Sequence, residues 1–430
     1  MPDFYSKLSV YICRNFETIP EEKRISSLKA DDLESMLSQN YLMVSSEYKL
    51  FGFVINWMNK DIERRRNYLT KLLKKIRLPL LTSDELDKVK KQILVYAKND
   101  EINSLVKKAM EYQMLEEKQP LMQDESTQVR SDILSIVILH KRNLLCFNTD
   151  TNRQSEIKYD TIDLELTDLV TYTCELSNYM YLYYHDYNYD DDDDGLTSKF
   201  YRFDPRHARW YSLPSMAFRE LLVLKGYNDK IYAIAGTDGS NYDLDTVEYF
   251  SIRDNRWRYC QSVHYSMREH AGCVCNNKIF ISGGSSGRDC LSRVSSYNPV
   301  DDSWTDEPSM MTARQTHCMV TVADQIYVIG GLDHDITFIS TIEMFKPGYV
   351  IWTTCTANMS VCHPNAVAKD NIIYIVGGYW DKGRLSTSIF KFDTDIQSIS
   401  IYANDNEIGG DNKCCLLKLP HAVYIEEENQ

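Results

Sequence analysis

The stretch IYVIGGLDHDITFISTIEMFKPGYVIW, from Ile326 to Trp352, decides the fold of this chain. It opens with an apolar run that ends at Gly330 and Gly331, continues through polar residues to Phe345, and closes on a tryptophan seven residues later. A run rich in β-branched and aromatic residues that stops at glycine predicts a strand followed by a turn. The same order of features returns elsewhere in the chain, so the sequence contains an internal repeat.

The repeat has a period of about 47 residues. The second residue of each glycine pair lies at positions 236, 284, 331 and 378, the first pair being the degenerate Ala235-Gly236, and the intervals are 48, 47 and 47. An aromatic residue precedes each tryptophan by seven positions, at Phe203, Phe250, Tyr297 and Phe345, before Trp210, Trp257, Trp304 and Trp352. Two further copies have Phe147 with Gln154, and Phe392 with Ile399, in these two positions. Regularity over six copies predicts six structural units.

Each unit contains enough strand-forming segments for four strands, which is the content of one propeller blade. Blades crowd together near the central axis, where glycine allows close approach because it has no Cβ. Farther from the axis the space between blades widens, and tryptophan with its aromatic partner is expected to fill it. Burying one such side chain contributes roughly 4–6 kcal/mol as an upper bound.

This pattern resembles the kelch repeat, and the resemblance covers residues 130 to 425. It implies a six-bladed β-propeller over residues 133–430, in which the terminal KCCLLKLPHAVYI supplies a strand that closes the first blade. The second blade departs from the pattern, with Tyr183 and Tyr184 near the position of the glycine pair.

The pattern changes before position 120, where helical periodicity replaces strands. Leu50, Phe51, Val54, Trp57 and Met58 form one apolar stripe. Ser46 is a predicted N-cap, and Thr82 with Glu85 forms a predicted capping box. A further amphipathic helix carries Ile102, Leu105, Val106 and Ala109 on its inner side. Residues 1–120 are therefore predicted to be an all-α domain, and residues 121–132 a linker.

Followed by a kelch propeller, the helical segment VSSEYKLFGFVINWMNKDIERRRNYLTKLLKKIRLPLL resembles a BACK domain. The chain is similar to the BTB–BACK–kelch, or kelch-like, proteins. In that family a dimerising BTB domain carries most of the contact with cullin-3 and precedes BACK. Because the present sequence starts near the end of the segment that joins BTB to BACK, we expect cullin-3 recruitment to be weakened.

The amino-acid composition limits the classes of partner and the cellular compartments that are possible for this chain. The formal net charge is −14, which argues against a general nucleic-acid binder. The sequence has no apolar run long enough to span a membrane and no secretory signal, and its twelve cysteines lack the spacing of a disulfide framework. These features predict a protein of the cytosol or nucleus that has reduced thiols and does not bind membranes.

No catalytic residue, metal ligand or cofactor is predicted. Cys273 and Cys275 alternate along a strand beside His270, and we interpret them as buried thiols. The sequence contains no P-loop and no GxSxG motif. The chain is therefore not expected to be an enzyme.

The resemblance places partner binding on one face of the propeller, where loops after the glycine pairs meet loops between blades. The predicted partner-binding residues are Arg219, Asp238, Tyr242, Arg268, Ser285, Arg288, Arg314, Asp333, His334, His363, Tyr379, Trp380 and Arg384. Two alternatives stay open. Trp380 either anchors a partner or folds onto its own blade, and the arginines between blades either bind a partner or pair with neighbouring blades.

An acidic insertion interrupts the second blade. Asp190, Asp191, Asp192, Asp193 and Asp194 follow one another among tyrosines. Their mutual repulsion disfavours a strand and predicts a solvated loop. The loop is either a surface loop without a binding role or a negatively charged segment that attracts a basic segment of a partner.

The resemblance implies a non-enzymatic substrate-recognition adaptor of a cullin-3 ubiquitin ligase, whose propeller binds the target protein. A cytoskeletal scaffold that binds actin, and a decoy that binds targets without recruiting cullin, are the alternatives.

Overall fold

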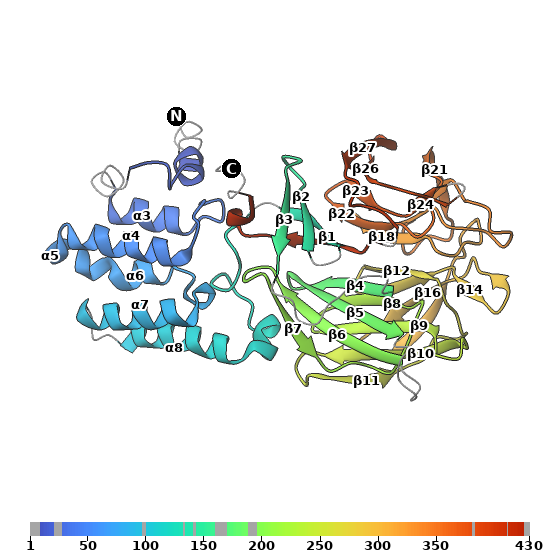
Figure 1. The fold of residues 1–430 in the computed structure, drawn as a ribbon, viewed down its shortest axis with the longest axis horizontal. Helices are drawn as coiled ribbons and strands as arrows, with labels where there is room; N and C mark the ends of the chain where they lie inside the picture. Colours follow the sequence, from blue (N-terminus) through green and yellow to red (C-terminus); the bar gives the residue numbers. More distant parts are fainter. Residues whose placement is uncertain are drawn as a thin grey trace. The chain divides into compact units, whose positions relative to one another are not determined.

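The computed structural model describes residues 9–20, 28–96, 100–131, 134–140, 143–159, 170–187, 196–380, 383–410 and 412–424. Contacts divide the chain into two compact units (Figure 1). The first unit comprises Met1–Leu134 together with Lys418–Gln430, and the second comprises Ser135–Leu417. The first is helical and the second is built from β-sheets, so the predicted fold class is confirmed.

The helical unit consists of short helices wrapped around one core. Its described helices include residues 9–14 and α3 (Ala30–Leu37), α4 (Glu47–Asn59), α5 (Ile62–Arg65), α6 (Leu69–Leu73), α7 (Ser83–Tyr96) and α8 (Asp100–Met114). Short 3₁₀ turns join or follow them: η1 (Arg66–Tyr68), η2 (Leu78–Leu80) and η3 (Glu116–Leu121). Figure 1 shows α7 and α8 lying side by side, as their contacts also indicate.

The predicted helix starts and core stripe are present. The Ser46 hydroxyl accepts a hydrogen bond from the Lys49 amide at 3.1 Å, which caps α4. Thr82 and Glu85 cap α7 reciprocally, with bonds of 2.9 and 3.3 Å. The five apolar stripe residues of α4 are all buried, and they anchor this helix in the centre of the unit.

A buried arginine holds the segment after η3 against the helices. Arg130 Nε donates to Glu47 Oε1 at 2.6 Å, and its Nη1 and Nη2 donate to the carbonyl oxygens of Leu37 and Lys75, each at 2.6 Å. Both charged side chains are almost fully buried. The segment predicted as a linker therefore packs as part of the helical unit, and the division between the units lies after Leu134.

In the second unit, the structure describes six four-stranded antiparallel sheets. Their strands, in spatial order, are as follows. Blade 1 has β28 (Cys414–Lys418), β1 (Leu134–His140), β2 (Asn143–Asn148) and β3 (Gln154–Lys158); blade 2 has β4 (Val170–Leu176), β5 (Tyr179–Tyr187), β6 (Leu196–Asp204) and β7 (Arg209–Leu213). Blade 3 has β8 (Val223–Tyr227), β9 (Lys230–Thr237), β10 (Asp243–Ser251) and β11 (Arg256–Cys260); blade 4 has β12 (Ala271–Cys275), β13 (Lys278–Ser282), β16 (Val294–Asn298) and β17 (Ser303–Glu307).

Blade 5 has β18 (Cys318–Val322), β19 (Gln325–Ile329), β20 (Thr341–Phe345) and β21 (Thr353–Asn358); blade 6 has β22 (Asn365–Lys369), β23 (Ile372–Val376), β26 (Ser388–Asp393) and β27 (Ser398–Asn404). Two short hairpins, β14 (Ser285–Ser286) with β15 (Asp289–Cys290) and β24 (Tyr379–Trp380) with β25 (Arg384–Leu385), follow the glycine pairs of blades 4 and 6. Because β28 lies beside β1, strands from both ends of the propeller sequence complete blade 1.

The seven-residue spacing between aromatic and tryptophan has a direct structural reason. Phe250 lies opposite Trp257 on paired strands, so the interval is the length of one hairpin. Three of the four repeat indoles donate a hydrogen bond to the preceding blade: Trp257 Nε1 to the Pro214 carbonyl at 2.8 Å, Trp304 Nε1 to the Gln261 carbonyl at 2.9 Å, and Trp352 Nε1 to the Pro308 carbonyl at 2.7 Å. The buried Trp210 Nε1 makes no such bond to the residues that the structure describes. These three tryptophans therefore link the outer strands of successive blades by hydrogen bonds, and they also fill the space between the blades.

The glycine pairs are required by close backbone contacts with the loop that leads into their own blade and with the loop that leads into the next blade. Gly331 has φ of +97°, and a Cβ there would lie 2.6 Å from the Gln315 carbonyl oxygen. Its amide donates to the Val361 carbonyl at 2.7 Å, on the loop that enters the next blade. A side chain would thus clash and strain the backbone at once.

Blade 2 replaces this glycine turn by a longer hairpin. Tyr183 and Tyr184 are buried within β5, whose pairing with β6 continues to Tyr187. The Tyr183 hydroxyl accepts a hydrogen bond from the Arg219 amide at 3.0 Å. The extended hairpin leads into the acidic insertion, whose residues Asp190–Asp194 lie outside the described residues.

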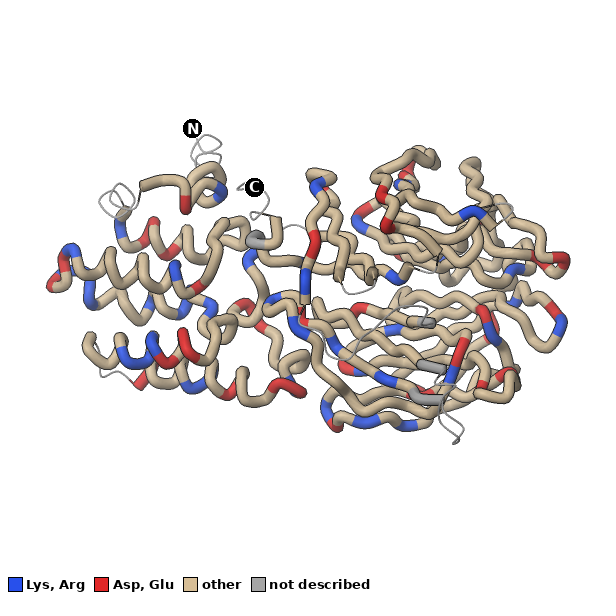
Figure 2. The backbone as a smooth tube through the Cα atoms, viewed as in Figure 1, with Lys and Arg blue, Asp and Glu red and all other residues tan. Residues whose placement is uncertain are grey.

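Acidic and basic residues are interspersed along both units (Figure 2). Across the described residues, no helix is both long and apolar enough to cross a membrane.

Candidate functional site

The loops that follow the second strand of a blade meet the loops that lead into its first strand. Antiparallel order places both sets at the same end of the propeller. One backbone bridge repeats at this end in four successive blades: Glu220↔Thr237, Arg268↔Ser285, Gln315↔Leu332 and Cys362↔Tyr379. We call this end of the propeller the loop face. It is formed by residues 214–222, 237–243, 261–270, 284–293, 308–317, 331–340, 359–364 and 378–387.

A chain of backbone hydrogen bonds connects the loops between blades. Glu269 donates its amide to the Leu221 carbonyl at 3.1 Å, Thr316 to Glu269 at 2.9 Å, and His363 to Thr316 at 2.8 Å. All four residues have left-handed backbones, with φ between 51° and 55°. Leucine, glutamate and threonine do not favour that conformation, so Leu221, Glu269 and Thr316 carry no local sequence signal for these hydrogen bonds beyond the 47-residue spacing.

Two of the predicted partner-binding arginines are structural. Arg314 Nη2 donates to Glu343 Oε1 at 2.6 Å, and Nη1 donates to the carbonyls of Gly330 and Thr341. Arg219 repeats the arrangement with Glu248 at 2.7 Å. Both guanidinium groups are buried, at 0% and 3% exposure. Their assignment to a binding surface is therefore corrected: each pairs with the third strand of the blade that it leads into.

Arg268 differs because its blade lacks the acidic partner. Ser295 occupies the position that Glu248 and Glu343 hold in the neighbouring blades. Arg268 instead turns outward, where Nη1 donates to Asp243 Oδ1 at 2.9 Å. Its side chain is 29% exposed, so it lies on the loop face but is already paired.

Asp238 and Asp333 close two loops of the same shape. Asp333 Oδ1 accepts the amides of Asp335 and Thr337, both at 2.9 Å. Asp238 Oδ1 accepts the amides of Ser240 and Tyr242 at 2.9 and 3.0 Å. These aspartates shape the loops, a role that aspartate at a loop start commonly has, and they hold the following side chains in fixed positions.

The remaining predicted residues divide by exposure. Tyr242, Arg288, His334 and Arg384 are exposed on the loop face. Ser285 is 5% exposed and buried behind its bridge to Arg268, which corrects its assignment to a binding surface.

In blade 6 the aromatic loop residues pack inward. Trp380 lies edge-on to Phe390 with ring centroids 5.2 Å apart, so it folds onto its own blade while staying partly exposed. His363 and Tyr379 meet edge-on at 6.0 Å. Of the two alternatives for Trp380, the structure favours the one in which it packs on its own blade.

Burial favours the neutral forms of His270, Cys273 and Cys275. Burial, with the charge of Arg219, lowers the pKa of His270 to about 3. Burial raises the pKa of Cys273 to about 12 and that of Cys275 to about 11. Such groups are poor acids, bases or nucleophiles near pH 7. In the part of the chain that the structure describes, no group of three His, Cys, Asp or Glu side chains is arranged to hold a metal ion.

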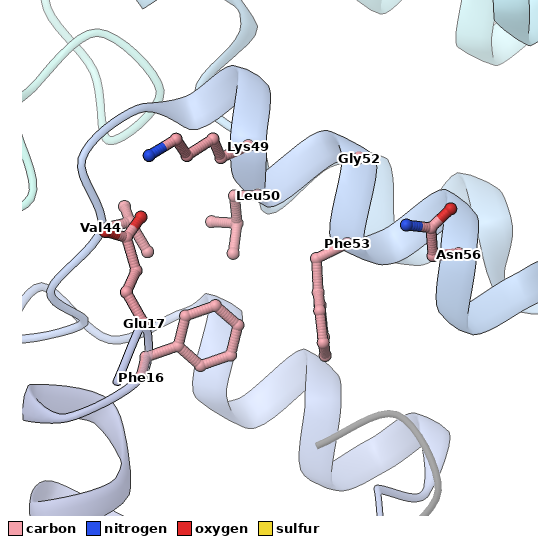
Figure 3. A pocket seen from close by; sticks show the side chains of 8 residues that line it. All are labelled: Phe16, Glu17, Val44, Lys49, Leu50, Gly52, Phe53 and Asn56. Atoms are coloured by element: carbon pink, nitrogen blue, oxygen red, sulfur yellow. The ribbon is translucent and has the colours of Figure 1, made fainter. Parts of the chain in front are cut away.

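The helical unit has a pocket of its own, with a volume of about 350 Å³ (Figure 3). The rings of Phe16 and Phe53 meet edge-on at 5.0 Å on one side of it. Glu17 lies at its rim, where it accepts hydrogen bonds from the Ser45 amide and hydroxyl at 2.9 and 2.8 Å. The predicted binding residues all lie elsewhere, in the propeller.

Comparison with known proteins agrees with both units. A family model described as "BTB And C-terminal Kelch" (BACK) matches residues 1–91, and one described as "KLHDC2/KLHL20/DRC7 Kelch-repeats domain" matches residues 139–331 and 224–407. Kelch-like protein 26 of Danio rerio is 26% identical over 407 residues, covering 90% of this chain and 66% of its own length. Kelch-like protein 36 of Mus musculus is 24% identical over 426 residues, covering 94% of this chain and 69% of its own.

Kelch-like protein 15 of Homo sapiens is 24% identical over 424 residues, covering 90% of this chain and 68% of its own length. The chain thus spans about two-thirds of the length of these relatives. The helical unit matches BACK, and the kelch repeats account for the six blades with their glycine pairs and tryptophans. The chain belongs to the kelch-like family, in which a BACK domain precedes a kelch-repeat propeller.

Proposed function

We propose that this chain is the target-recognition part of a cullin-3 ubiquitin ligase adaptor, with the target protein bound on the loop face. The observation that carries the proposal is the construction of that face. Buried ion pairs and the backbone belt fix its loops, and exposed side chains such as Tyr242 and Arg288 project from them. A rigid scaffold presenting exposed loop residues is suited to protein recognition.

The chain needs no chemistry of its own in this function. Ubiquitin transfer takes place on other subunits, and the BACK helices act as a spacer that holds the target. A cytosolic or nuclear location fits this function and stays a prediction.

The test is affinity purification of the tagged full chain from cells, with immunoblotting for cullin-3 and for ubiquitinated clients. Cullin-3 together with a client whose ubiquitination depends on the chain supports the proposal. Clients without cullin-3 indicate the decoy alternative, and actin filament components without cullin-3 indicate a scaffold.

Matched variants locate the client site. Tyr242→Ala removes a side chain that is 70% exposed on the loop face, whereas Tyr259→Ala removes one that is 67% exposed on the outer strand β11. We expect Tyr242→Ala to reduce client recovery and Tyr259→Ala to leave it unchanged. Equal recovery with both variants would place the client elsewhere.

A further inference from the structure

Ile336 combines two unfavourable features at the tip of the blade 5 loop. Its φ is +59°, in the left-handed region, and its side chain is 70% exposed. Branching at Cβ makes this conformation costly for isoleucine. Among the described non-glycine residues with positive φ, the other β-branched one is Thr316, which is buried.

Blade 3 shows that the loop shape does not require isoleucine. Asn241 holds the equivalent position with the same φ of 59°. Its amide donates to the Asp238 carbonyl at 3.0 Å, as the Ile336 amide does to Asp333 at 3.2 Å. Asparagine tolerates the left-handed region and favours solvent. Folding alone would therefore favour asparagine at position 336.

A second apolar side chain is exposed on the equivalent loop of blade 3. Tyr242 follows Asn241 and is 70% exposed, and the Asp238 carboxylate fixes its amide. Aromatic and branched aliphatic side chains held on rigid loops are suited to act as binding anchors, because little conformational freedom is lost on contact.

The exposed side chains around these two anchors carry a net negative charge when the buried arginines are excluded. Arg219 and Arg314 are neutralised inside the blades, and Arg268 is paired with Asp243. The basic loop-face residues that the structure describes as exposed are Arg288, Arg293 and Arg384; Asp289 directly follows the first, and the Arg293 guanidinium lies over the Tyr265 ring at 4.9 Å. Apart from Asp243, which pairs with Arg268, six described acidic side chains there are at least partly exposed, twice the number of exposed basic ones: Glu220, Asp238, Glu269, Asp289, Asp333 and Asp335.

We propose that Ile336 and Tyr242 anchor a lysine- or arginine-rich segment of the target protein that carries apolar side chains. This inference rests on the proposed function and specifies the chemistry of the bound target. Apolar contacts at the two anchors supply affinity, and the surrounding carboxylates select basic over acidic segments and speed association. Association should slow as ionic strength rises.

The first measurement separates binding from folding. In Ile336→Asn, the thermal unfolding midpoint of the full chain should stay unchanged or rise, because asparagine relieves the strain. The matched exchange Asn241→Ile should lower it. A midpoint that falls in Ile336→Asn would mean that Ile336 serves the fold, and would overturn the proposal.

The second measurement uses a phage-displayed library of random twelve-residue peptides, selected on the full chain at low salt. We expect enriched peptides to be basic with apolar residues, and to bind Ile336→Asn at least tenfold more weakly. Enriched peptides that are acidic or neutral, yet are lost with Tyr242→Ala, would contradict the charge inference while leaving the proposed function standing. Enriched peptides indifferent to both substitutions, or the absence of enrichment, would contradict the loop face as a peptide-binding site and so count against both.

Discussion

Arg314 and Glu343 form a buried ion pair between a loop and the third strand of blade 5, with Nη2 and Oε1 2.6 Å apart and both side chains excluded from solvent. Burial lowers the pKa of Arg314, and the Glu343 carboxylate opposes that shift. The same carboxylate accepts the amides of Met311 and Thr312, at 2.7 and 3.0 Å. One side chain thus organises the whole loop that leads into the blade.

Removing one member of this pair should be costly. We expect Arg314→Met to destabilise the chain by about 3–5 kcal/mol, because Glu343 would keep a buried charge without its partner. Arg268→Met is the matched control: its side chain is partly exposed, so the expected cost is about 0–1 kcal/mol. Urea unfolding measures both. Equal costs in the two variants would contradict the structural role of Arg314.

The glycine pairs offer a test that separates backbone strain from collision. Gly331 and Gly348 have similar φ values of +97° and +93°, but no heavy atom lies within 4 Å of a Cβ built at Gly348. Gly348→Ala should therefore cost about 1–2 kcal/mol from conformation alone. Gly331→Ala adds a clash with the Gln315 carbonyl, and we expect about 1–3 kcal/mol more. Similar unfolding free energies for the two variants would show that Gly331 does not approach the Gln315 backbone as closely as described.

Mild acidification should lower the unfolding free energy of the chain, because His270 takes up a proton only in the unfolded state. The pKa of His270 is depressed from 6.5 to about 3, so between these pH values the unfolded chain binds a proton that the folded chain does not. The unfolding free energy should then decrease as pH falls below about 6.5, by up to about 1.4 kcal/mol per pH unit for this group.

The measurement is urea unfolding between pH 7 and pH 5 in the wild type and in His270→Gln. We expect a shallower pH dependence in the variant, which cannot take up the proton. Exposed His334 supplies the control: His334→Gln is measured in parallel, to show what the loss of an exposed imidazole does to the slope. If His270→Gln leaves the pH dependence of the unfolding free energy unchanged, the His270 imidazole is not held in its neutral form by burial.

The segment after η3 should detach when its buried arginine is lost. Arg130→Met removes the bonds to Glu47 and to the carbonyls of Leu37 and Lys75. We expect amide hydrogen exchange to accelerate over residues 127–131 by more than tenfold, since the segment would lose its buried ion pair and keep the bond from Arg77 Nη1 to the Gln128 carbonyl at 2.8 Å. Lys107→Met is the control, because its ion pair with Glu111 is exposed. Unchanged protection in Arg130→Met would indicate that backbone contacts hold the segment.

Much of the fold could be predicted because its signals are local or periodic. The 47-residue spacing of glycine pairs and tryptophans set the number of blades, and Thr82 with Glu85 marked the start of a helix. The candidate site was predicted less well. The sequence placed Arg219, Arg268 and Arg314 at equivalent positions, yet the structure buries two and leaves one partly exposed.

The sequence by itself determined the repeat, the four-stranded unit and the helical segment, because these follow from residue periodicity and turn chemistry within a few tens of positions. Only the tertiary structure decided which loop side chains reach solvent. Whether Arg268 faces outward depends on Ser295 standing in place of a glutamate two strands away, and the left-handed backbone at Ile336 depends on Asp333 closing its loop. The burial or exposure of the loop-face arginines is therefore set by contacts between residues far apart along the chain, such as Arg268 with Asp243 of the preceding blade and Arg314 with Glu343.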